Sequence, residues 1–173
     1  MPRLYRKTLL DAPLEAVWAF HEDTQAGLTA LSPPEADVQV TRADPPGVGA
    51  KVVIRAKTPI GRKKWVAVYR EWRPPAGSRP HRTAQFVDEA ETSPFKSWRH
   101  THRFEETIDE GRTKVWAIDD VRYELPLGPL GLLANPILVR PQLNKMFDYR
   151  HAQLQKLLSR REGMKARASA AGD

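Results

Sequence analysis

Six extended segments follow one another after residue 37, and the turn signals between them are short. Their predicted bounds are 38–42, 51–57, 63–72, 83–91, 96–107 and 113–125. In several of them large or apolar side chains alternate with charged ones, as expected for strands with one buried face. Because the gaps, such as "DEGR" at 109–112, are too short for parallel crossovers, neighbouring segments are expected to pair as antiparallel hairpins.

Helical patterns flank this run of strands. Residues 3–10 predict a further strand, and "DAPLEAVWAFHED" (residues 11–23) then predicts a helix with Asp11 as a candidate N-cap. A second short helix is expected at 25–31, ending before Pro33. A long helix is expected at about 140–161, where apolar residues recur on one face.

The order of these elements predicts the fold class. We expect an α+β protein in which a curved antiparallel sheet of about seven strands wraps around the long C-terminal helix, with two short helices after the first strand. Length gives no reason to divide the chain, so residues 1–162 are expected to form a single domain. The small, polar residues 163–173 are expected to form a disordered tail.

Composition excludes several classes of function. The chain contains no cysteine, which excludes disulfides and thiolate chemistry and leaves His, Asp and Glu as metal ligands. Its net charge is +7, but the basic residues are scattered and no nucleic-acid-binding fingerprint is found, so we predict no nucleic-acid partner. The chain shows neither a signal peptide nor a run of membrane-span length, so we expect a cytoplasmic protein without stable membrane insertion, as a monomer or homodimer.

The segment "PFKSWRHTHRF" (residues 94–104) contains two histidines two residues apart. In a strand, Trp98, His100, His102 and Phe104 share one face. The opposite face carries mainly charged residues and belongs in water. We therefore predict that the two histidines and the two aromatic residues face the concave side of the sheet.

The same alternation test applies to the neighbouring strands. The residues that it assigns to the concave face are Trp65, Glu71, Phe86, Asp88, Asp119 and Tyr123. Buried charges are costly unless they are paired and hydrogen-bonded, so Asp88 and Asp119 are the expected partners of His100 and His102.

Three interpretations of the two histidines remain open at this stage. They fix the sheet by pairing with the aspartates, they bind polar groups of a ligand, or they take part in catalysis or metal binding. For catalysis the candidates are His100, His102, Asp119 and Tyr123, with a His–Asp pair as general acid and base and the tyrosine donating to a developing enolate. A His-x-His pair does not define a metal site by itself, so we assign no metal and no cofactor.

Several short motifs, taken in order, resemble one superfamily over most of residues 3–158. They are "APLEAVWAF", "LTALSPP", "FVDE", "PFKSWRHTHRFE", "VRYELPLGPLG" and "FDYRHAQL", together with Trp65 and Glu71-Trp72. This pattern resembles the SRPBCC superfamily, also called START-like, birch-pollen-allergen-like or polyketide cyclase/dehydrase-like, and within it bacterial proteins of unassigned ligand. The segments "EDTQAGL" after the first helix and "PPAGSRPHR" (residues 74–82) depart from the usual pattern.

The resemblance implies a helix-grip fold with a cavity between the sheet and the C-terminal helix. The implied function is binding of a small hydrophobic or amphipathic molecule, such as a lipid, a quinone or a polyketide-like compound. The expected ligand-binding residues are Trp65, Glu71, Phe86, Asp88, Trp98, His100, His102, Phe104, Asp119, Tyr123, Phe147 and Arg150.

Two alternatives accompany this implication. One is a cofactor-independent cyclase or dehydratase that uses the His–Asp pair. The other is a chaperone that passes a lipid or quinone to a partner protein through the apolar segment "PLGPLG" (residues 126–131). Within the same superfamily, an oxygenase with its own Rieske centre is excluded because the chain has no cysteine.

Overall fold

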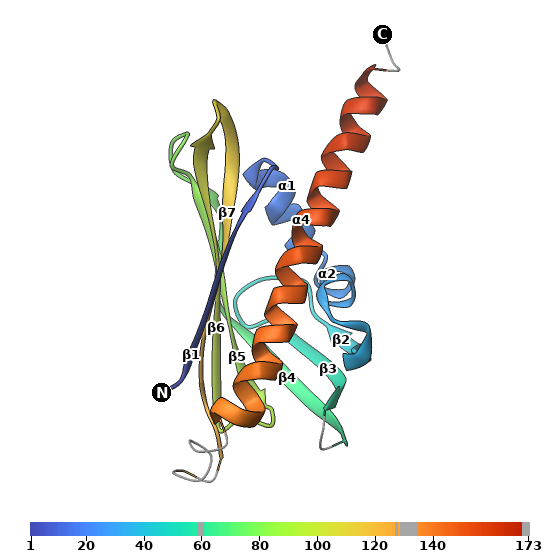
Figure 1. Cartoon of the computed structure of the whole chain (residues 1–173), viewed down its shortest axis with the longest axis vertical. Helices are drawn as coiled ribbons and strands as arrows, with labels where there is room; N and C mark the ends of the chain where they lie inside the picture. Colours follow the sequence, from blue (N-terminus) through green and yellow to red (C-terminus); the bar gives the residue numbers. More distant parts are fainter. Residues whose placement is uncertain (59–60, 127, 129–134, 171–173) are drawn as a thin grey trace.

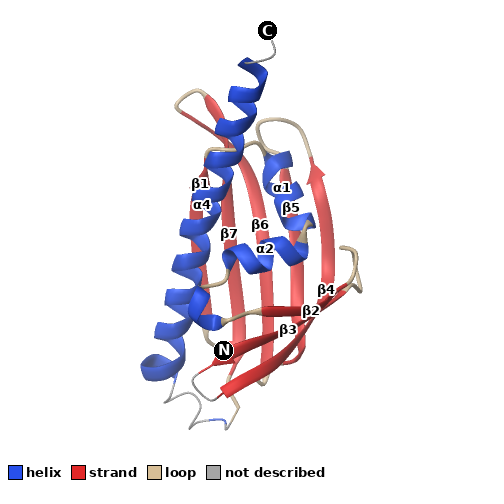
Figure 2. Ribbon diagram, turned by 90° about the vertical axis from the view of Figure 1, so that its right-hand side faces the viewer, coloured by secondary structure: helices blue, strands red, loops and turns tan. Residues whose placement is uncertain are grey.

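A computed structural model describes residues 1–58, 61–126, 128 and 135–170, with side chains in the last helix described as far as Leu158. The strands form a single antiparallel sheet (Figure 2). Its strands, in the spatial order β1-β7-β6-β5-β4-β3-β2, have these bounds: β1 Arg3–Leu10, β2 Gln39–Ala43, β3 Lys51–Thr58, β4 Gly61–Ala76, β5 Thr83–Thr92, β6 Ser97–Asp109 and β7 Arg112–Glu124.

The helices lie together on one side of the curved sheet (Figure 1). They are α1 Leu14–Glu22, α2 Thr24–Leu31, the short 3-10 turn η1 Pro34–Ala36, the π-helical turn η2 Asn135–Val139 and the long helix α4 Arg140–Ala170. The predicted α+β class, the seven-stranded curved sheet, the two short helices after the first strand and the long C-terminal helix are confirmed. The predicted disorder of residues 163–173 stays a prediction.

One predicted helix cap is wrong. Helix α1 begins at Leu14, its N-cap is Pro13, and no side chain caps it. Asp11 lies two residues too early to cap and instead forms an ion pair with Arg112, with 3.1 Å between Oδ2 and Nη1. The side-chain cap belongs to α2, where Asp23 Oδ1 accepts from the backbone N–H of Ala26 at 3.0 Å.

Strand β4 extends four residues beyond its predicted end at Trp72. It pairs with β3 only as far as Val68 and then continues beside β5 alone. Beyond Val68 the side of β4 that faced β3 has no strand partner. On that side the missing N–H groups of Pro74 and Pro75 interrupt no ladder of hydrogen bonds. The prolines that suggested a strand end therefore lie inside the strand.

Helix α4 packs onto the sheet through one stripe. Its buried residues Leu143, Phe147, Leu154 and Leu158 recur at helical spacing and face the sheet. The first two pack with Trp98, Val121 and Tyr123 in one cluster, and the last two join the larger cluster beneath α1. Between these two apolar clusters the buried surface is polar, and that polar zone is part of the candidate site.

Candidate functional site

A cavity of about 950 Å³ lies between the concave face of the sheet, α2 and the first part of α4. Most of the side chains that line it are aliphatic or aromatic. Eight of the residues predicted to bind a ligand line this cavity: Trp65, Phe86, Asp88, Trp98, His100, His102, Phe147 and Arg150. Most of these residues lie on the inward face of β5 or β6 or on the sheet-facing side of α4, so their side chains line the same cavity.

Glu71 does not face the cavity, and the prediction of its inward orientation is wrong. The register between β4 and β5 shifts between Tyr69 and Glu71, so Arg70 is an extra residue in β4. This bulge reverses the alternation beyond it. Trp72 turns inward, 5.2 Å from the Phe86 ring centroid, while Glu71 lies on the outer face and pairs with Arg99 at 3.0 Å.

Three further predicted residues are buried behind the cavity wall and do not line it. Phe104 packs beneath α1, with its ring centroid 4.7 Å from that of His21. The Tyr123 hydroxyl donates to Asn135 Oδ1 at 2.8 Å, so its proton is already used. Asp119 lies behind the two histidines of β6. The prediction that these residues reach the cavity is wrong because strand alternation gives the face of a residue but not what covers it.

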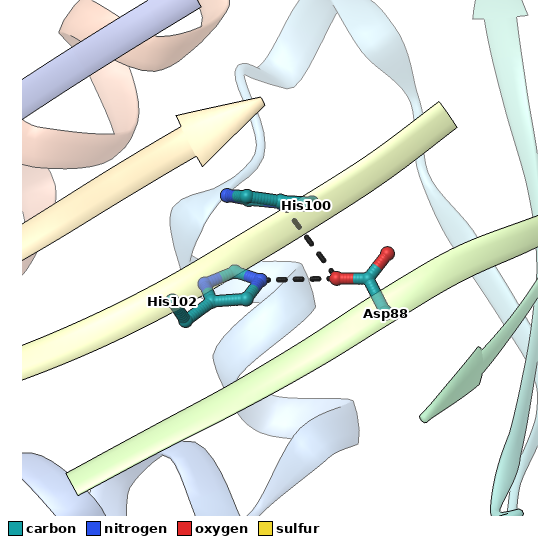
Figure 3. A group of neighbouring side chains, drawn as sticks. All are labelled: Asp88, His100 and His102. Carbon is teal, nitrogen blue, oxygen red and sulfur yellow. Dashed lines mark hydrogen bonds and ion pairs between the residues drawn. The ribbon is translucent and has the colours of Figure 1, made fainter. Parts of the chain in front are cut away.

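Asp88 and His102 form a buried hydrogen-bonded pair at the cavity wall (Figure 3). Asp88 Oδ2 lies 3.1 Å from His102 Nε2 and 3.7 Å from His100 Nδ1. Arg150 Nη2 lies 3.4 Å from His102 Nδ1. Because a guanidinium can only donate, Nδ1 accepts and Nε2 carries the proton that is donated to Asp88.

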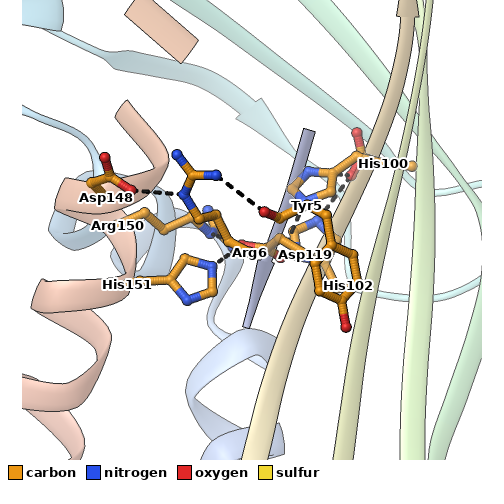
Figure 4. Close-up of polar contacts among 9 residues, drawn as sticks. Tyr5, Arg6, His100, His102, Asp119, Asp148, Arg150 and His151 are labelled. Carbon is orange, nitrogen blue, oxygen red and sulfur yellow. Dashed lines mark hydrogen bonds and ion pairs between the residues drawn. The ribbon is translucent and has the colours of Figure 1, made fainter. Parts of the chain in front are cut away.

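Asp119 connects this pair to α4. Its Oδ1 lies 3.1 Å from both His100 Nε2 and His102 Nδ1. Its Oδ2 lies 3.2 Å from Arg150 Nε and 3.0 Å from His151 Nε2, both of which reach it from α4 (Figure 4). The contact between Asp119 and His100 is short but is not aligned as a hydrogen bond, so His100 Nε2 is buried without a hydrogen-bond partner.

Burial and charge set the protonation states of the cluster. Burial alone raises the pKa of both aspartates. For Asp88 the hydrogen bond from His102 and the nearby basic groups together outweigh burial and lower the pKa below its ordinary value. For Asp119 the Arg150 guanidinium and the two β6 histidines together outweigh burial and lower the pKa well below its ordinary value. Burial lowers the pKa of His100. Both aspartates are therefore charged, and His100 is neutral, at neutral pH.

Two histidines that were not named as site residues belong to this cluster. His21 of α1 lines the cavity, and its burial lowers the pKa of its imidazole to about 3. His151 of α4 holds Asp119 from the side opposite the strands. His21 lies on the first predicted helix, and His151 directly follows Arg150, which was predicted to bind a ligand. Helical periodicity gave no reason to connect either of them with residues on β5–β7.

Comparisons with known proteins give matches at the level of structure alone. No protein-family model and no curated protein matches the sequence. Among solved structures, TTHA0849 from Thermus thermophilus is 15% identical, with a TM-score of 0.58, and the match covers 90% of this chain and 95% of that one. The KanY protein is also 15% identical, with a TM-score of 0.59 and coverage of 92% and 99%.

A third solved structure is an enzyme. Norcoclaurine synthase from Thalictrum, solved as a point mutant in complex with a transition-state analogue, is 11% identical, with a TM-score of 0.54 and coverage of 90% and 94%. Within the described residues, no helix of this chain has the length and apolar character needed to span a membrane. The element order, the sheet topology and these matches agree with the fold that the motif resemblance implied, and the chain shares the helix-grip fold of these solved structures.

Proposed function

We propose that the protein binds a small hydrophobic or amphipathic molecule in the cavity beneath α4. The observation that carries this proposal is the cavity itself, whose volume of about 950 Å³ is in the range of ligand sites. Its lining is mainly apolar, with a few convergent polar groups, which is the usual composition of such sites.

The arrangement of the lining suggests how a ligand is oriented. Trp65 and Trp98 pack edge to face, 5.1 Å between centroids, and give one aromatic wall. Asp88, His102 and Arg150 form a polar zone elsewhere on the same cavity. An amphipathic molecule with an apolar body and one polar group, such as a lipid, a quinone or a polyketide-like compound, matches both parts.

The first experiment looks for a retained ligand and then blocks the cavity. Protein purified without detergent is extracted with organic solvent for mass spectrometry, and the emptied protein is titrated with an apolar fluorescent dye. Ala67→Phe places a ring in the cavity and is expected to weaken dye binding by about tenfold or more, a loss of at least about 1.4 kcal/mol, because the ring occupies space that the dye needs.

The matched control is Val66→Phe, at the next residue of β4, which does not line the cavity. It is expected to leave dye affinity unchanged. Absence of dye binding by the emptied wild-type protein, or equal weakening by both variants, overturns the proposal. Thermal melts of both variants show whether each remains folded.

Acid–base catalysis on the bound molecule is a second candidate. It is favoured by one observation, the buried His102–Asp88 pair at the cavity wall. Tyr123 is not available as an enolate donor because its hydroxyl proton is held by Asn135. If a poly-β-keto thioester is cyclised no faster with wild-type protein than with a folded His102→Gln variant, this candidate is rejected.

Three narrower sequence predictions are carried forward with the proposal. The chaperone alternative relies on the segment at 126–131, of which 127 and 129–131 lie outside the described residues. The cytoplasmic location and the monomeric or homodimeric state stay predictions. A pull-down that recovers no partner with ligand-loaded protein would count against the chaperone alternative.

A further inference from the structure

Three metal-ligating side chains converge at the cavity wall. His100 and His102 lie two residues apart on β6 and so share a face, and Asp88 on β5 is the cross-strand partner of His100. One donor atom from each of the three lies within 4.8 Å of the other two. Figure 3 shows both imidazoles directed toward the same carboxylate. The convergence therefore follows from strand register and not from a flexible loop.

The separations match those of ligands around a small cation. Zn²⁺ binds histidine nitrogen and carboxylate oxygen at roughly 2.0–2.2 Å, so two ligands at a tetrahedral angle lie roughly 3.4 Å apart. The measured separations from Asp88 Oδ2 are 3.1 Å to His102 Nε2 and 3.7 Å to His100 Nδ1. The two separations that involve Asp88 Oδ2 therefore bracket the distance expected around Zn²⁺, and all three donor atoms lie within 4.8 Å of one another.

The other ring nitrogens have the partner that metal-bound histidines usually have. In most metal sites the non-ligating nitrogen of each histidine contacts a carboxylate or carbonyl, which fixes the ring. Here His100 Nε2 and His102 Nδ1 each lie 3.1 Å from the same oxygen, Asp119 Oδ1. Asp119 is itself held by Arg150 and His151.

One ring nitrogen of the cluster has no aligned partner. His100 Nε2 is buried without an aligned hydrogen bond, although Asp119 Oδ1 lies 3.1 Å away. A cation on His100 Nδ1 would fix the ring proton on Nε2, where Asp119 can accept it after a small rotation.

We propose that Asp88 Oδ2, His100 Nδ1 and His102 Nε2 bind one divalent first-row transition metal ion, with Zn²⁺ as the best match to the donor set. All three residues line the cavity, so at least one coordination position faces the space in which we propose that a ligand lies. The chain has no cysteine to compete as a ligand. The metal site is independent of the proposed apolar ligand, because either can bind without the other.

Binding requires one proton to move. In the metal-free protein His102 Nε2 carries a proton and donates it to Asp88. When the metal occupies Nε2, the single ring proton of the neutral imidazole has to move to Nδ1, where Asp119 Oδ1 can accept it at 3.1 Å. Asp119 is thus a positioning residue that selects the metal-binding tautomer of His102.

The test uses the untagged full chain, because a histidine tag would bind the metal itself. The protein is stripped with a chelator and titrated with Zn²⁺ by calorimetry, and with Co²⁺ by visible spectroscopy. We expect one ion per chain and a Co²⁺ spectrum of low coordination number. Asp88→Asn and His100→Gln are expected to abolish stoichiometric binding, and Asp119→Asn to weaken it by about 10–100-fold.

The matched control is His81→Ala, at an exposed histidine outside the cluster, which is expected to bind Zn²⁺ as the wild type does. No stoichiometric binding by the wild type, or unchanged binding by folded Asp88→Asn and His100→Gln variants, overturns the proposal. If those variants fail to fold, X-ray absorption of the zinc-loaded wild type decides. A spectrum that shows two imidazoles and a carboxylate bound to zinc supports the proposed site. A spectrum that shows one imidazole or none overturns it. Dye binding, measured separately, shows whether the cavity proposal stands or fails on its own.

Discussion

Arg82 joins the ends of the central strands β5 and β6 to α1. Its guanidinium pairs twice with Glu106, at 3.0 Å from Nε and 2.5 Å from Nη2, and once with Glu15 of α1 at 2.5 Å. The Glu106 side chain is only 1% exposed, so this pair is screened much less than the surface pairs. The hydrogen bonds from Arg82 lower the pKa of Glu106 below its ordinary value.

The direction of this shift gives a pH-dependent prediction. A carboxyl whose folded pKa is lowered adds stability above its ordinary pKa, and that stability is lost as the pH falls through the lowered value. Glu106→Gln is therefore expected to reduce the free energy of unfolding by about 1–3 kcal/mol at pH 7, with the difference from wild type shrinking below about pH 4. Urea titrations of wild type and variant measure the free energy of unfolding at pH 7 and at pH 3.

The control for this prediction is the neighbouring Glu105, which pairs with the exposed Arg103. Glu105→Gln is expected to change the free energy of unfolding by less than about 0.5 kcal/mol. A Glu106→Gln difference that persists unchanged at pH 3 contradicts the assignment of the effect to the ion pair.

At the scale of elements, the bulge in β4 decides which side chains reach the core. Because Arg70 is an extra residue, Tyr69 and Trp72 both turn inward and stack, with 5.3 Å between ring centroids. Trp72 also lies 4.7 Å from Trp18, so the bulged strand contacts α1. A β4 strand of regular alternation would place Glu71 in this apolar position.

The bulge predicts opposite outcomes at two adjacent residues. Trp72→Ala is expected to reduce the free energy of unfolding by about 3 kcal/mol, because it leaves a void among aromatic rings. Glu71→Ala is expected to cost less than about 1 kcal/mol, because its ion pairs lie on the outer face. Denaturant titration of the two variants compares them. The reverse order of costs contradicts the register described for β4.

Sequence reasoning succeeded where the backbone period is regular and failed where it is interrupted. On β6 the alternation runs without a bulge, and Trp98, His100 and His102 were placed correctly on the cavity side. The β4 bulge contains no glycine that would mark it in the sequence. Regular alternation therefore placed Glu71 on the inner face, which Trp72 occupies instead. The link from His151 to Asp119 depends on how α4 is rotated about its axis relative to β7, and that rotation is set by tertiary packing.

At the scale of the whole molecule, α4 extends past the sheet at its C-terminal end (Figure 2). In Figure 1 its C-terminal end extends beyond α1. The last buried contact described on α4 is made by Leu158, which is 1% exposed. The body of the domain therefore does not depend on the chain beyond this point for its described core.

Truncation tests this division. A chain that ends at residue 162 is expected to melt within about 2 °C of the full chain, because no described core contact is removed. A chain that ends at His151 loses Leu154 and Leu158, each worth about 2–5 kcal/mol, and is not expected to fold. Thermal unfolding followed by circular dichroism distinguishes the cases. A large drop in the melting temperature of the 162-residue chain contradicts the proposed domain limit.

The two outermost strands of the sheet, β1 and β2, affect a different property, which is resistance to aggregation. An exposed, long and flat edge strand can act as a template for another chain. The β1 edge lies under α4, to which Arg6 is fixed through Asp148 at 2.7 Å and Asn144 at 2.9 Å. The β2 edge is five residues long, mostly exposed, and interrupted by a register shift between Val40 and Arg42. Neither of these two edges offers another chain a long apolar strand, so neither is expected to start a cross-β aggregate.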